Sequence, residues 1–261
     1  MISTEPVRSE RPDEVMRAVE RDGVAILVGC GPEPEAAVAA ARSIFGDRVV
    51  AIPEPAEVRA GGVKDRTAAT VDESMPLPPH TDGFAYGDRY PDYFLLSCAQ
   101  ASGTGGESLA VDGHAVIAEL RTHSGGAELL KRMSTVPIDQ TEPGMQGSVS
   151  PLIMRNPDGR LMLRRFPFQK PAADSTDATA DGDMIEQWHS AVAAAGDVAL
   201  RFKVNTGEIV VFDNYRMMHG RDPYDDVSRL MWRVWVWTTS ALGVPEGQLH
   251  SDSRYASVDD L

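Results

Sequence analysis

The chain has 261 residues, and its 39 Asp and Glu against 25 Lys and Arg give a formal net charge of −14. Nucleic-acid affinity rests on neutralising phosphates with Lys and Arg, so an acidic chain argues against a nucleic-acid or membrane-surface protein. The two cysteines lie outside any Cys-x-x-Cys spacing, which excludes a disulfide scaffold and a thiolate zinc site. No apolar run approaches the roughly 18 residues of a membrane span, and the start lacks the apolar core of a signal peptide. We therefore expect a cytoplasmic protein.

Residues 1–52 predict alternating helices and strands. Residues 12–21 have helical apolar spacing, and Gly23 follows as a stop signal. The continuous apolar run 24–28 is typical of a strand buried on both faces. Residues 33–45 have helical composition, and 49–52 are again strand-like. The segment lacks the three-glycine fingerprint of a dinucleotide-binding fold, so we exclude that fold.

Two long segments show little periodicity. Residues 53–79 and 140–183 contain many Pro, Gly, Thr and Asp, so both are expected to be long loops bordering a site. The second ends at Asp183, a plausible N-cap for a helix that continues to Gly196.

The strongest strand signals come late in the chain. Residues 208–212 and 230–239 are dominated by β-branched and aromatic side chains. The tail after Ser240 is polar and is expected to be loosely held. No linker is visible, so one mixed domain over residues 1–261 is the simplest organisation.

Among the six histidines, His80 has the surroundings of a metal ligand. In an extended segment, residues i and i+2 project to the same face, so His80 and Asp82 can bind one metal while Thr81 points away. An imidazole and a carboxylate suit iron(II), zinc or manganese. A His-x-Asp pair often arises by chance in so acidic a chain, so the prediction of a metal site requires a third ligand.

His219 supplies that third ligand. It follows a predicted strand that runs into a loop, which can place its imidazole opposite the first pair. Two histidines and one carboxylate leave three coordination positions open, as in the facial triad of non-haem iron(II) oxygenases.

Two arginines near the start of the last strand indicate an anion site. Period-2 alternation puts Arg229 and Arg233 on one face, where burial is expected. A buried guanidinium needs an anion, and its donor fork matches a carboxylate. A dicarboxylate that chelates the metal would present its far carboxylate here, where Ser108, after a Gly-rich turn, can bond it. The alternative is an edge strand whose arginines face solvent.

These motifs resemble, in order and spacing, the taurine dioxygenase/clavaminate synthase-like (TauD/TfdA) superfamily of iron(II)- and 2-oxoglutarate-dependent oxygenases. The resemblance spans residues 75–240. It is carried by His80-Thr-Asp82, Gly105-Gly-Glu-Ser108, Asp213-Asn-Tyr-Arg-Met-Met-His-Gly-Arg221 and Arg229-Leu-Met-Trp-Arg233. The third run is most similar to the γ-butyrobetaine and amino-acid hydroxylase branches.

The resemblance implies an α+β, mainly β fold, with a double-stranded β-helix, or jelly-roll, core and flanking helices. It implies the iron ligands His80, Asp82 and His219, and 2-oxoglutarate bound by Arg229 and Ser108. Arg233 matches a second family arginine, for which cosubstrate and substrate roles both stay open. Because halogenating relatives lack the carboxylate ligand, Asp82 implies hydroxylation, desaturation or cyclisation with O2, and release of succinate and CO2.

The substrate is less determined than the cofactors. Phe84 and Tyr86 follow the metal pair, and Asn214 and Tyr215 precede His219, so these residues could contact a substrate or pack in the core. Our hypothesis is a small polar molecule, such as an amino acid or a derivative, from specialised metabolism. The oligomeric state and the carbon attacked do not follow from the sequence.

Two other classes of protein could share the ligand set: a non-redox metal-binding jelly-roll protein and a zinc hydrolase. Neither accounts for Ser108 and Arg229 at a spacing that suits a dicarboxylate. Anaerobic addition of iron(II) and 2-oxoglutarate should give a weak visible charge-transfer band, whereas tight zinc binding without this band favours the alternatives.

Overall fold

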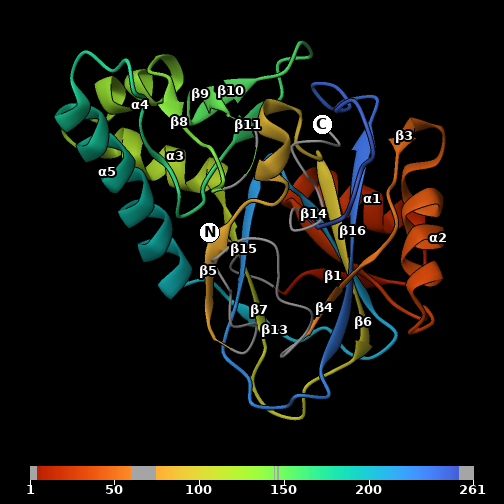
Figure 1. The fold of residues 1–261 in the computed structure, drawn as a ribbon. Helices are drawn as coiled ribbons and strands as arrows, with labels where there is room; N and C mark the ends of the chain where they lie inside the picture. The colour runs from red at the N-terminus through yellow and green to blue at the C-terminus, as the bar shows by residue number, and fades with distance from the viewer. Residues whose placement is uncertain (1–4, 60–74, 144, 146, 253–261) are drawn as a thin grey trace.

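The computed structural model describes residues 5–59, 75–143, 145 and 147–252. Its strands form two principal sheets (Figure 1). The larger has the order β1-β2-β14-β6-β16-β3, with β4 also paired to β16, and all its pairs are antiparallel except β1–β2. The smaller has the order β13-β7-β15-β5 and is antiparallel throughout.

The larger sheet contains β1 (Val7–Ser9), β2 (Val24–Leu27), β3 (Val49–Ala51), β4 (Ala56–Val58), β6 (Tyr93–Gln100), β14 (Ile209–Asp213) and β16 (Leu230–Thr238). The smaller contains β5 (Leu77–His80), β7 (Ser108–Asp112), β13 (Arg201–Phe202) and β15 (Met217–Arg221). The helices are α1 (Pro12–Asp22), α2 (Pro34–Phe45), α3 (Gly113–Thr122), α4 (Gly126–Thr135) and α5 (Ala178–Asp197), with 3-10 turns η1 (Gly46–Arg48) and η2 (Phe84–Arg89). Two further small sheets contain β8 (Ile138–Asp139), β9 (Val149–Ser150) and β12 (Lys170–Pro171), and β10 (Ile153–Arg155) and β11 (Leu161–Leu163).

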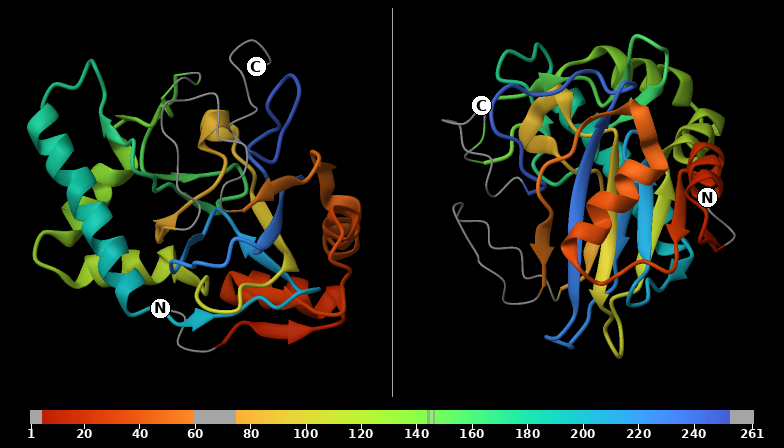
Figure 2. Two further views of the ribbon diagram at one scale, coloured as in Figure 1. Left: turned by 60° about the horizontal axis from the view of Figure 1, so that its bottom comes forward. Right: turned by 90° about the vertical axis from the view of Figure 1, so that its right-hand side faces the viewer.

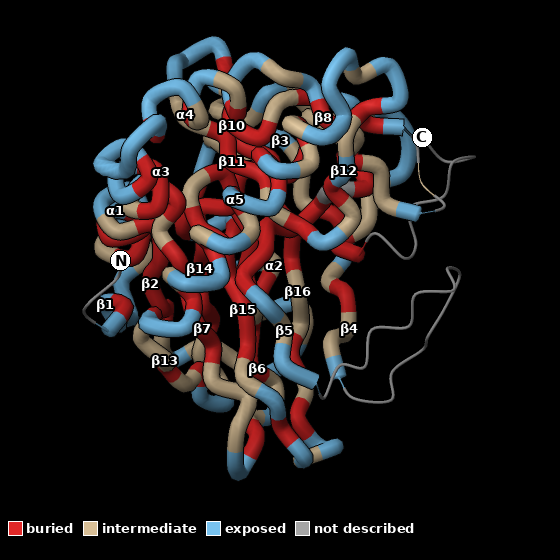
Figure 3. Tube along the Cα trace, turned by 90° about the vertical axis from the view of Figure 1, so that its left-hand side faces the viewer, coloured by how far each residue is buried: buried red, intermediate tan, exposed pale blue. Residues whose placement is uncertain are grey.

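The alternation of side chains along the strands builds the layers. On β14, Ile209 and Val211 pack in a cluster with residues of α1 and α2, whereas Val210 and Phe212 belong to the cluster between the two sheets. The outer face of the smaller sheet packs against α3 and α5. The result is helices, two sheets and helices in succession (Figures 1 and 2), with the buried trace concentrated in the strands (Figure 3).

Most elements predicted near the two ends of the chain are confirmed. The first helix ends at Gly23, whose φ of 83° suits a left-handed C-cap, and the Gly23 N–H donates to Val19 O. All four residues of β2 are buried, as its continuous apolar run predicts. The predicted helix at 33–45 and the strands at 49–52, 208–212 and 230–239 correspond to α2, β3, β14 and β16.

The long-loop predictions are wrong in part. Residues 53–79 include β4 and most of β5, while 60–74 lie outside the described residues. Residues 140–183 include four short strands and the start of α5. That helix begins at Ala178 because Asp177 caps it, its Oδ1 accepting the Ala180 N–H at 3.0 Å, so the predicted N-cap Asp183 lies inside the helix.

A buried chain of amides holds the 140–183 segment to α5. Gln140 Nε2 donates to Ser150 O and Oγ, each at 2.9 Å, and Gln169 Nε2 donates to Gln140 Oε1 at 2.9 Å. His189 Nε2 lies 2.8 Å from Gln169 Oε1 and donates to it when protonated. These hydrogen bonds hold in place a segment whose composition predicts a long loop.

The network predicts a specific pH dependence of stability. Burial, reinforced by the charge of Arg165, lowers the pKa of His189 to about 4, against an ordinary value of about 6.5. As the pH falls between these values, the unfolded chain takes up a proton that the folded chain does not, so the contribution of neutral His189 is lost. From about pH 7 to about pH 5, Tm should fall more steeply for the wild type than for His189→Gln. The exposed His123→Gln is the control, and equal slopes for wild type and His189→Gln would contradict this prediction.

No helix in the described ranges has the length and apolarity needed to cross a bilayer. Both cysteines are free: Cys98 is buried, and Cys30 is only partly buried.

Candidate active site

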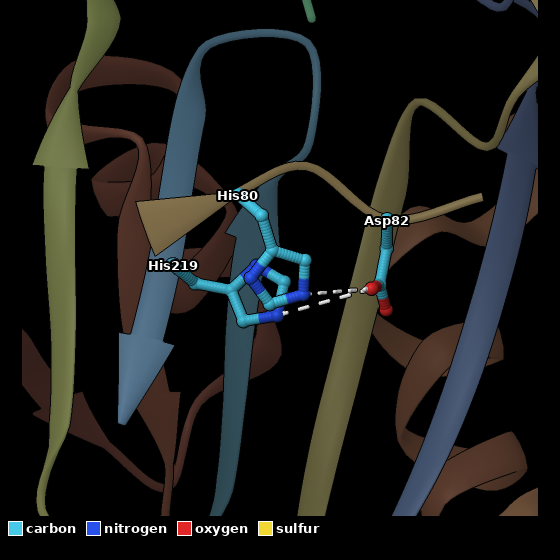
Figure 4. Close-up of side chains that lie close together, drawn as sticks. All are labelled: His80, Asp82 and His219. Carbon is cyan, nitrogen blue, oxygen red and sulfur yellow. Dashed lines mark ion pairs between the residues drawn. The ribbon is translucent and has the colours of Figure 1, made fainter. Parts of the chain in front are cut away.

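Three predicted metal ligands converge between the two sheets (Figure 4). His80 is the last residue of β5, and His219 lies directly opposite it on β15. Asp82 follows two residues after the end of β5. The Nε2 atoms of His80 and His219 lie 3.5 and 3.9 Å from Asp82 Oδ1. All three side chains are almost completely buried.

Local sequence explains the approach of the two histidine strands. Pro78 and Pro79 lack backbone donors, which suits β5 to the edge of its sheet. Gly220, next to His219, faces this edge, and a Cβ there would lie 2.5 Å from Leu77 O. The absence of a side chain at Gly220 lets the strands pair closely. Thr81 points away from the ligands, as predicted: its N–H donates to Arg165 O at 3.0 Å, and its Oγ1 accepts the Arg165 N–H at 3.2 Å.

The site favours the ligating protonation states. Burial, followed by the neighbouring His80, holds the pKa of His219 well below its ordinary value, so its imidazole is neutral. Burial opposes ionisation of Asp82, but Arg233 and the two histidines outweigh it and lower the pKa of the carboxyl. His80 Nδ1 lies 3.0 Å from Pro78 O, and donation to this carbonyl leaves Nε2 as the ligating atom.

The three donors fit a divalent metal. One nitrogen or oxygen from each residue lies within 4.8 Å of the others. Metal bonds of about 2.0–2.2 Å bring neighbouring ligand atoms to about 3 Å, so a small contraction completes the site. Two imidazoles and a carboxylate suit iron, zinc or manganese. Within the described part of the chain, this is the one such group of three.

Asp82 is held from two sides. Its Oδ2 accepts the Trp235 indole N–H at 2.9 Å and lies 3.4 Å from Arg233 Nη1. Its backbone N–H donates to Asn214 Oδ1, and its carbonyl accepts from Asn214 Nδ2, each at 3.0 Å. Oδ1 is thereby the oxygen that faces both imidazoles.

A buried cation lies at the other predicted binding position. Arg229 is 5% exposed, and its Nη1 has no hydrogen-bond partner in the part of the chain that the structure describes. Its guanidinium lies 4.8 Å from the Tyr224 ring centroid, and a Cβ at Gly106 would lie 3.1 Å from its Nε. Ser108, buried at the start of β7, follows two residues after Gly106. Burial and the charge of Arg221 lower the pKa of Arg229. An anion bound next to the guanidinium would therefore stabilise its charged form.

The structure gives other roles to two predicted substrate residues. Asn214 is completely buried, and its amide bonds the backbone of Asp82 and Pro91. The hydroxyl of completely buried Tyr215 accepts the Leu242 N–H at 3.0 Å, and its ring stacks on Arg160. Each side chain is thus used within the fold, and substrate contact by either residue stays a prediction.

The remaining predicted contacts are only partly described. Tyr86 packs its ring edge-on against Trp235 and Trp237, and its hydroxyl bonds the backbone of His250. The side chain of Phe84 lies outside the described residues. Arg233 pairs with Asp82 and Asp252, so a role with cosubstrate or substrate stays a prediction.

Three features of the site are absent from the sequence-based predictions. Trp235 could have been found, because it shares the period-2 face of Arg229 and Arg233. Arg165, whose backbone bonds Thr81, and Asp252, which pairs with Arg233, have no local sequence signal.

The sequence matches the Taurine catabolism dioxygenase TauD, TfdA family over residues 3–235. It is 25% identical to a uridine-5'-phosphate dioxygenase of Amycolatopsis sp., over 83% of this chain and 84% of that protein. It is 26% identical to the gamma-butyrobetaine dioxygenase of Pseudomonas sp. (strain AK-1), over 82% of this chain but only 56% of that protein.

Solved structures with the same fold include an asparagine oxygenase, AsnO, with a TM-score of 0.61 and 17% identity, over 85% of this chain and 77% of that one. The non-haem iron oxygenase OrfP, solved with Fe and alpha-ketoglutaric acid, has a TM-score of 0.59 and 17% identity, over 87% and 79% of the chains. AAD-2, solved with Mn(II) and N-oxalylglycine, has a TM-score of 0.61 and 17% identity, over 92% and 93%.

The structure combines a mixed α/β fold with two histidines and an aspartate that could together hold a metal ion. The chain belongs to the TauD/TfdA family of dioxygenases. Family membership and the three-ligand site together confirm the prediction of an iron(II)- and 2-oxoglutarate-dependent dioxygenase.

Proposed function

We propose that the protein hydroxylates an unactivated C–H bond of a small, polar, anionic substrate, with its site built in a jelly-roll core within one domain. Two facing antiparallel sheets and the likeness to AsnO and OrfP support the jelly roll. The observation that carries the proposal is a three-ligand metal site together with a buried arginine, Arg229, that has no acidic partner among the described residues.

His80, Asp82 and His219 hold iron(II) in this proposal, leaving three positions for other ligands. When bound, iron and 2-oxoglutarate supply the dioxygen chemistry that inserts one oxygen atom into the substrate and releases succinate and CO2. Trp235 and Arg233 fix Asp82, and the Pro78 carbonyl fixes the His80 ring. These contacts pre-set the ligand atoms before the metal binds.

Arg229 and Ser108 bind the far carboxylate of 2-oxoglutarate. The unpartnered Nη1 of Arg229 supports this role, since a buried donor without an acceptor costs free energy that a carboxylate would recover. Gly106 supports it as well, because a larger side chain there would press on the guanidinium.

A second cation supports a substrate with an anionic group. Arg165 is half-buried, its Nε has no hydrogen-bond partner, and among the described residues no carboxylate pairs with it. Burial lowers the pKa of Arg165. Its backbone bonds to Thr81 place it beside the two ligands His80 and Asp82.

The relatives suggest two kinds of anionic substrate. AsnO has been solved with 3-hydroxyasparagine, and OrfP with (3S)-hydroxy-L-Arg, which supports an amino acid. The Amycolatopsis relative acts on uridine-5'-phosphate, so a nucleotide is the second candidate. A carboxylate and a phosphate both suit an unpaired arginine.

The test is an anaerobic titration of the full chain with iron(II) and then 2-oxoglutarate. A weak visible charge-transfer band is expected, followed by succinate release when amino acids, betaines and nucleotides are screened in air. No band together with tight zinc binding would overturn the proposal in favour of a zinc hydrolase or a non-redox metal protein. Succinate release stimulated only by uncharged compounds or large aromatics would overturn the substrate class.

Replacing Arg165 by glutamine should raise the KM of the anionic substrate by about 10- to 100-fold, because a hydrogen bond to a charged group contributes about 1.5–3 kcal/mol. The affinity for 2-oxoglutarate should change little. Steady-state succinate release measures both constants, and the exposed Arg121→Gln is the control. An unchanged substrate KM in Arg165→Gln would remove Arg165 from the substrate site.

A further inference from the structure

The prediction of a loosely held tail is wrong for residues 250–252. Ser251 and Asp252 are each only 1% exposed. The segment lies beside η2, where the Tyr86 hydroxyl accepts the His250 N–H at 2.7 Å and bonds the His250 carbonyl at 3.2 Å (Figure 1). The polar composition of the tail predicts a loosely held segment. The contacts that hold residues 250–252 come from distant parts of the chain, so no local sequence pattern indicates them.

The same segment also binds Arg233, the arginine that pairs with the Asp82 carboxylate. Arg233 Nε donates to Ser251 O at 2.7 Å, and Arg233 Nη2 lies 3.1 Å from Asp252 Oδ2. The Trp235 backbone N–H donates to Ser251 Oγ at 3.2 Å. Both residues of β16 that reach Asp82 are thus tied to residues 251–252.

Because of these contacts, the two carboxylate oxygens of Asp82 have different neighbours. Arg233 Nη1 and the Trp235 indole face Oδ2, whereas the two imidazoles face Oδ1. A guanidinium balanced by Asp82 alone would draw that carboxylate away from a metal. With Asp252 as its second carboxylate, Arg233 is held in place and its charge is shared.

We propose that residues 251–252 are an outer part of the metal site, in which Asp252 is a positioning residue that acts through Arg233 to present Asp82 Oδ1 to the metal. The proposal rests on the ligand set of the proposed function. It assigns a role to a segment that follows the last predicted motif, at Arg233, by almost twenty residues.

Binding and ordering are reciprocal, so the coupling runs in both directions. If Asp252 strengthens metal binding, then metal binding must strengthen the hold on residues 250–252. Amide hydrogen exchange in this segment should slow when the site is filled with Co(II), in addition to any change at Asp82 itself.

The experiment uses the full chain and Co(II) as the probe, with affinity followed by protein fluorescence and coordination by the visible spectrum. Asp252→Asn should weaken Co(II) binding by about 10- to 100-fold, the usual effect of losing an outer-shell partner. At saturating Co(II), its spectrum should still differ from wild type, which a purely structural role would not produce. Asp252→Glu should restore much of the affinity, and the exposed Asp158→Asn should change nothing.

A double variant tests whether Asp252 affects Co(II) binding through Arg233. If Asp252 acts through Arg233, then adding Asp252→Asn to Arg233→Gln should cause no further loss of Co(II) affinity. Additive losses, or wild-type affinity and spectrum in Asp252→Asn, would overturn the inference while leaving the three-ligand site intact. Absence of Co(II) binding by the wild type would overturn the proposed function and this inference with it.

Discussion

Replacing His219 by alanine is expected to abolish oxygenase activity and to weaken metal binding by more than the roughly 10- to 100-fold that loss of an outer hydrogen bond costs. Its imidazole is one of the three proposed ligands, and burial keeps it neutral and able to coordinate. Its ring also packs 4.2 Å from those of His80 and Phe94, so its loss leaves a cavity. Anaerobic iron(II) titration and succinate release measure the two effects.

Circular dichroism and thermal unfolding of His219→Ala establish whether the variant remains folded. His123→Ala is the matched control, since the His123 side chain is 60% exposed and lies outside the site. Retention of the 2-oxoglutarate charge-transfer band by a folded His219→Ala would exclude His219 as a ligand and would require a different metal site.

Replacing Arg229 by methionine should have opposite effects on stability and function. In the cosubstrate-free protein it removes a buried cation that forms no ion pair within the described ranges, so the free energy of unfolding should rise by about 1 kcal/mol or more. With Mn(II) present, 2-oxoglutarate at about 100 times its Kd should stabilise the wild type by about 2.7 kcal/mol. The variant should gain almost none of this, and its KM for 2-oxoglutarate should rise by about 30-fold or more, as for a truncated buried charge pair.

Arg201→Met provides the contrast. Arg201 is half-buried but bonds the carbonyls of Gly196 and Ala199 and the carboxylate of Asp222, so its loss should destabilise the protein and leave the response to 2-oxoglutarate unchanged. Thermal unfolding with and without 2-oxoglutarate compares the two variants. An Arg229→Met protein that is less stable and still stabilised by 2-oxoglutarate would show that Arg229 is structural.

The predictable part of the site is carried by local periodicity. The i, i+2 spacing places His80 beside Asp82. The alternation along β16 puts Arg233 in phase with Met231 and Trp235, which pack between the sheets, and Arg229 lies one residue before the strand. His219 follows a predicted strand, and the register of β15 against β5 places it opposite His80. These residues share patterns that a single strand or a short motif contains.

The parts that sequence could not supply depend on contacts between distant segments. The strands within residues 140–183 are two or three residues long, too short for any period to be recognised, and the buried amides of Gln140 and Gln169 stabilise that segment. In the sequence, nothing distinguishes Asp252 from the many other acidic residues, because its contact with Arg233 is formed only in the fold. Asn214 looked like a substrate contact because it lies in the motif of His219, but its amide holds the Asp82 backbone.

The position of His80 at the end of an edge strand has a consequence for handling the protein. In the described part of the sheet, β5 is hydrogen-bonded only to β15, so it is an edge strand and prone to local opening. An ion shared by His80 and His219 would fasten this strand to its neighbour, and by mass action the fastening weakens as free metal falls. Chelation would then free β5 to open and leave the edge of β15 unpaired, a template for association with another chain. Aggregation after iron loss would in that case begin at the active site itself.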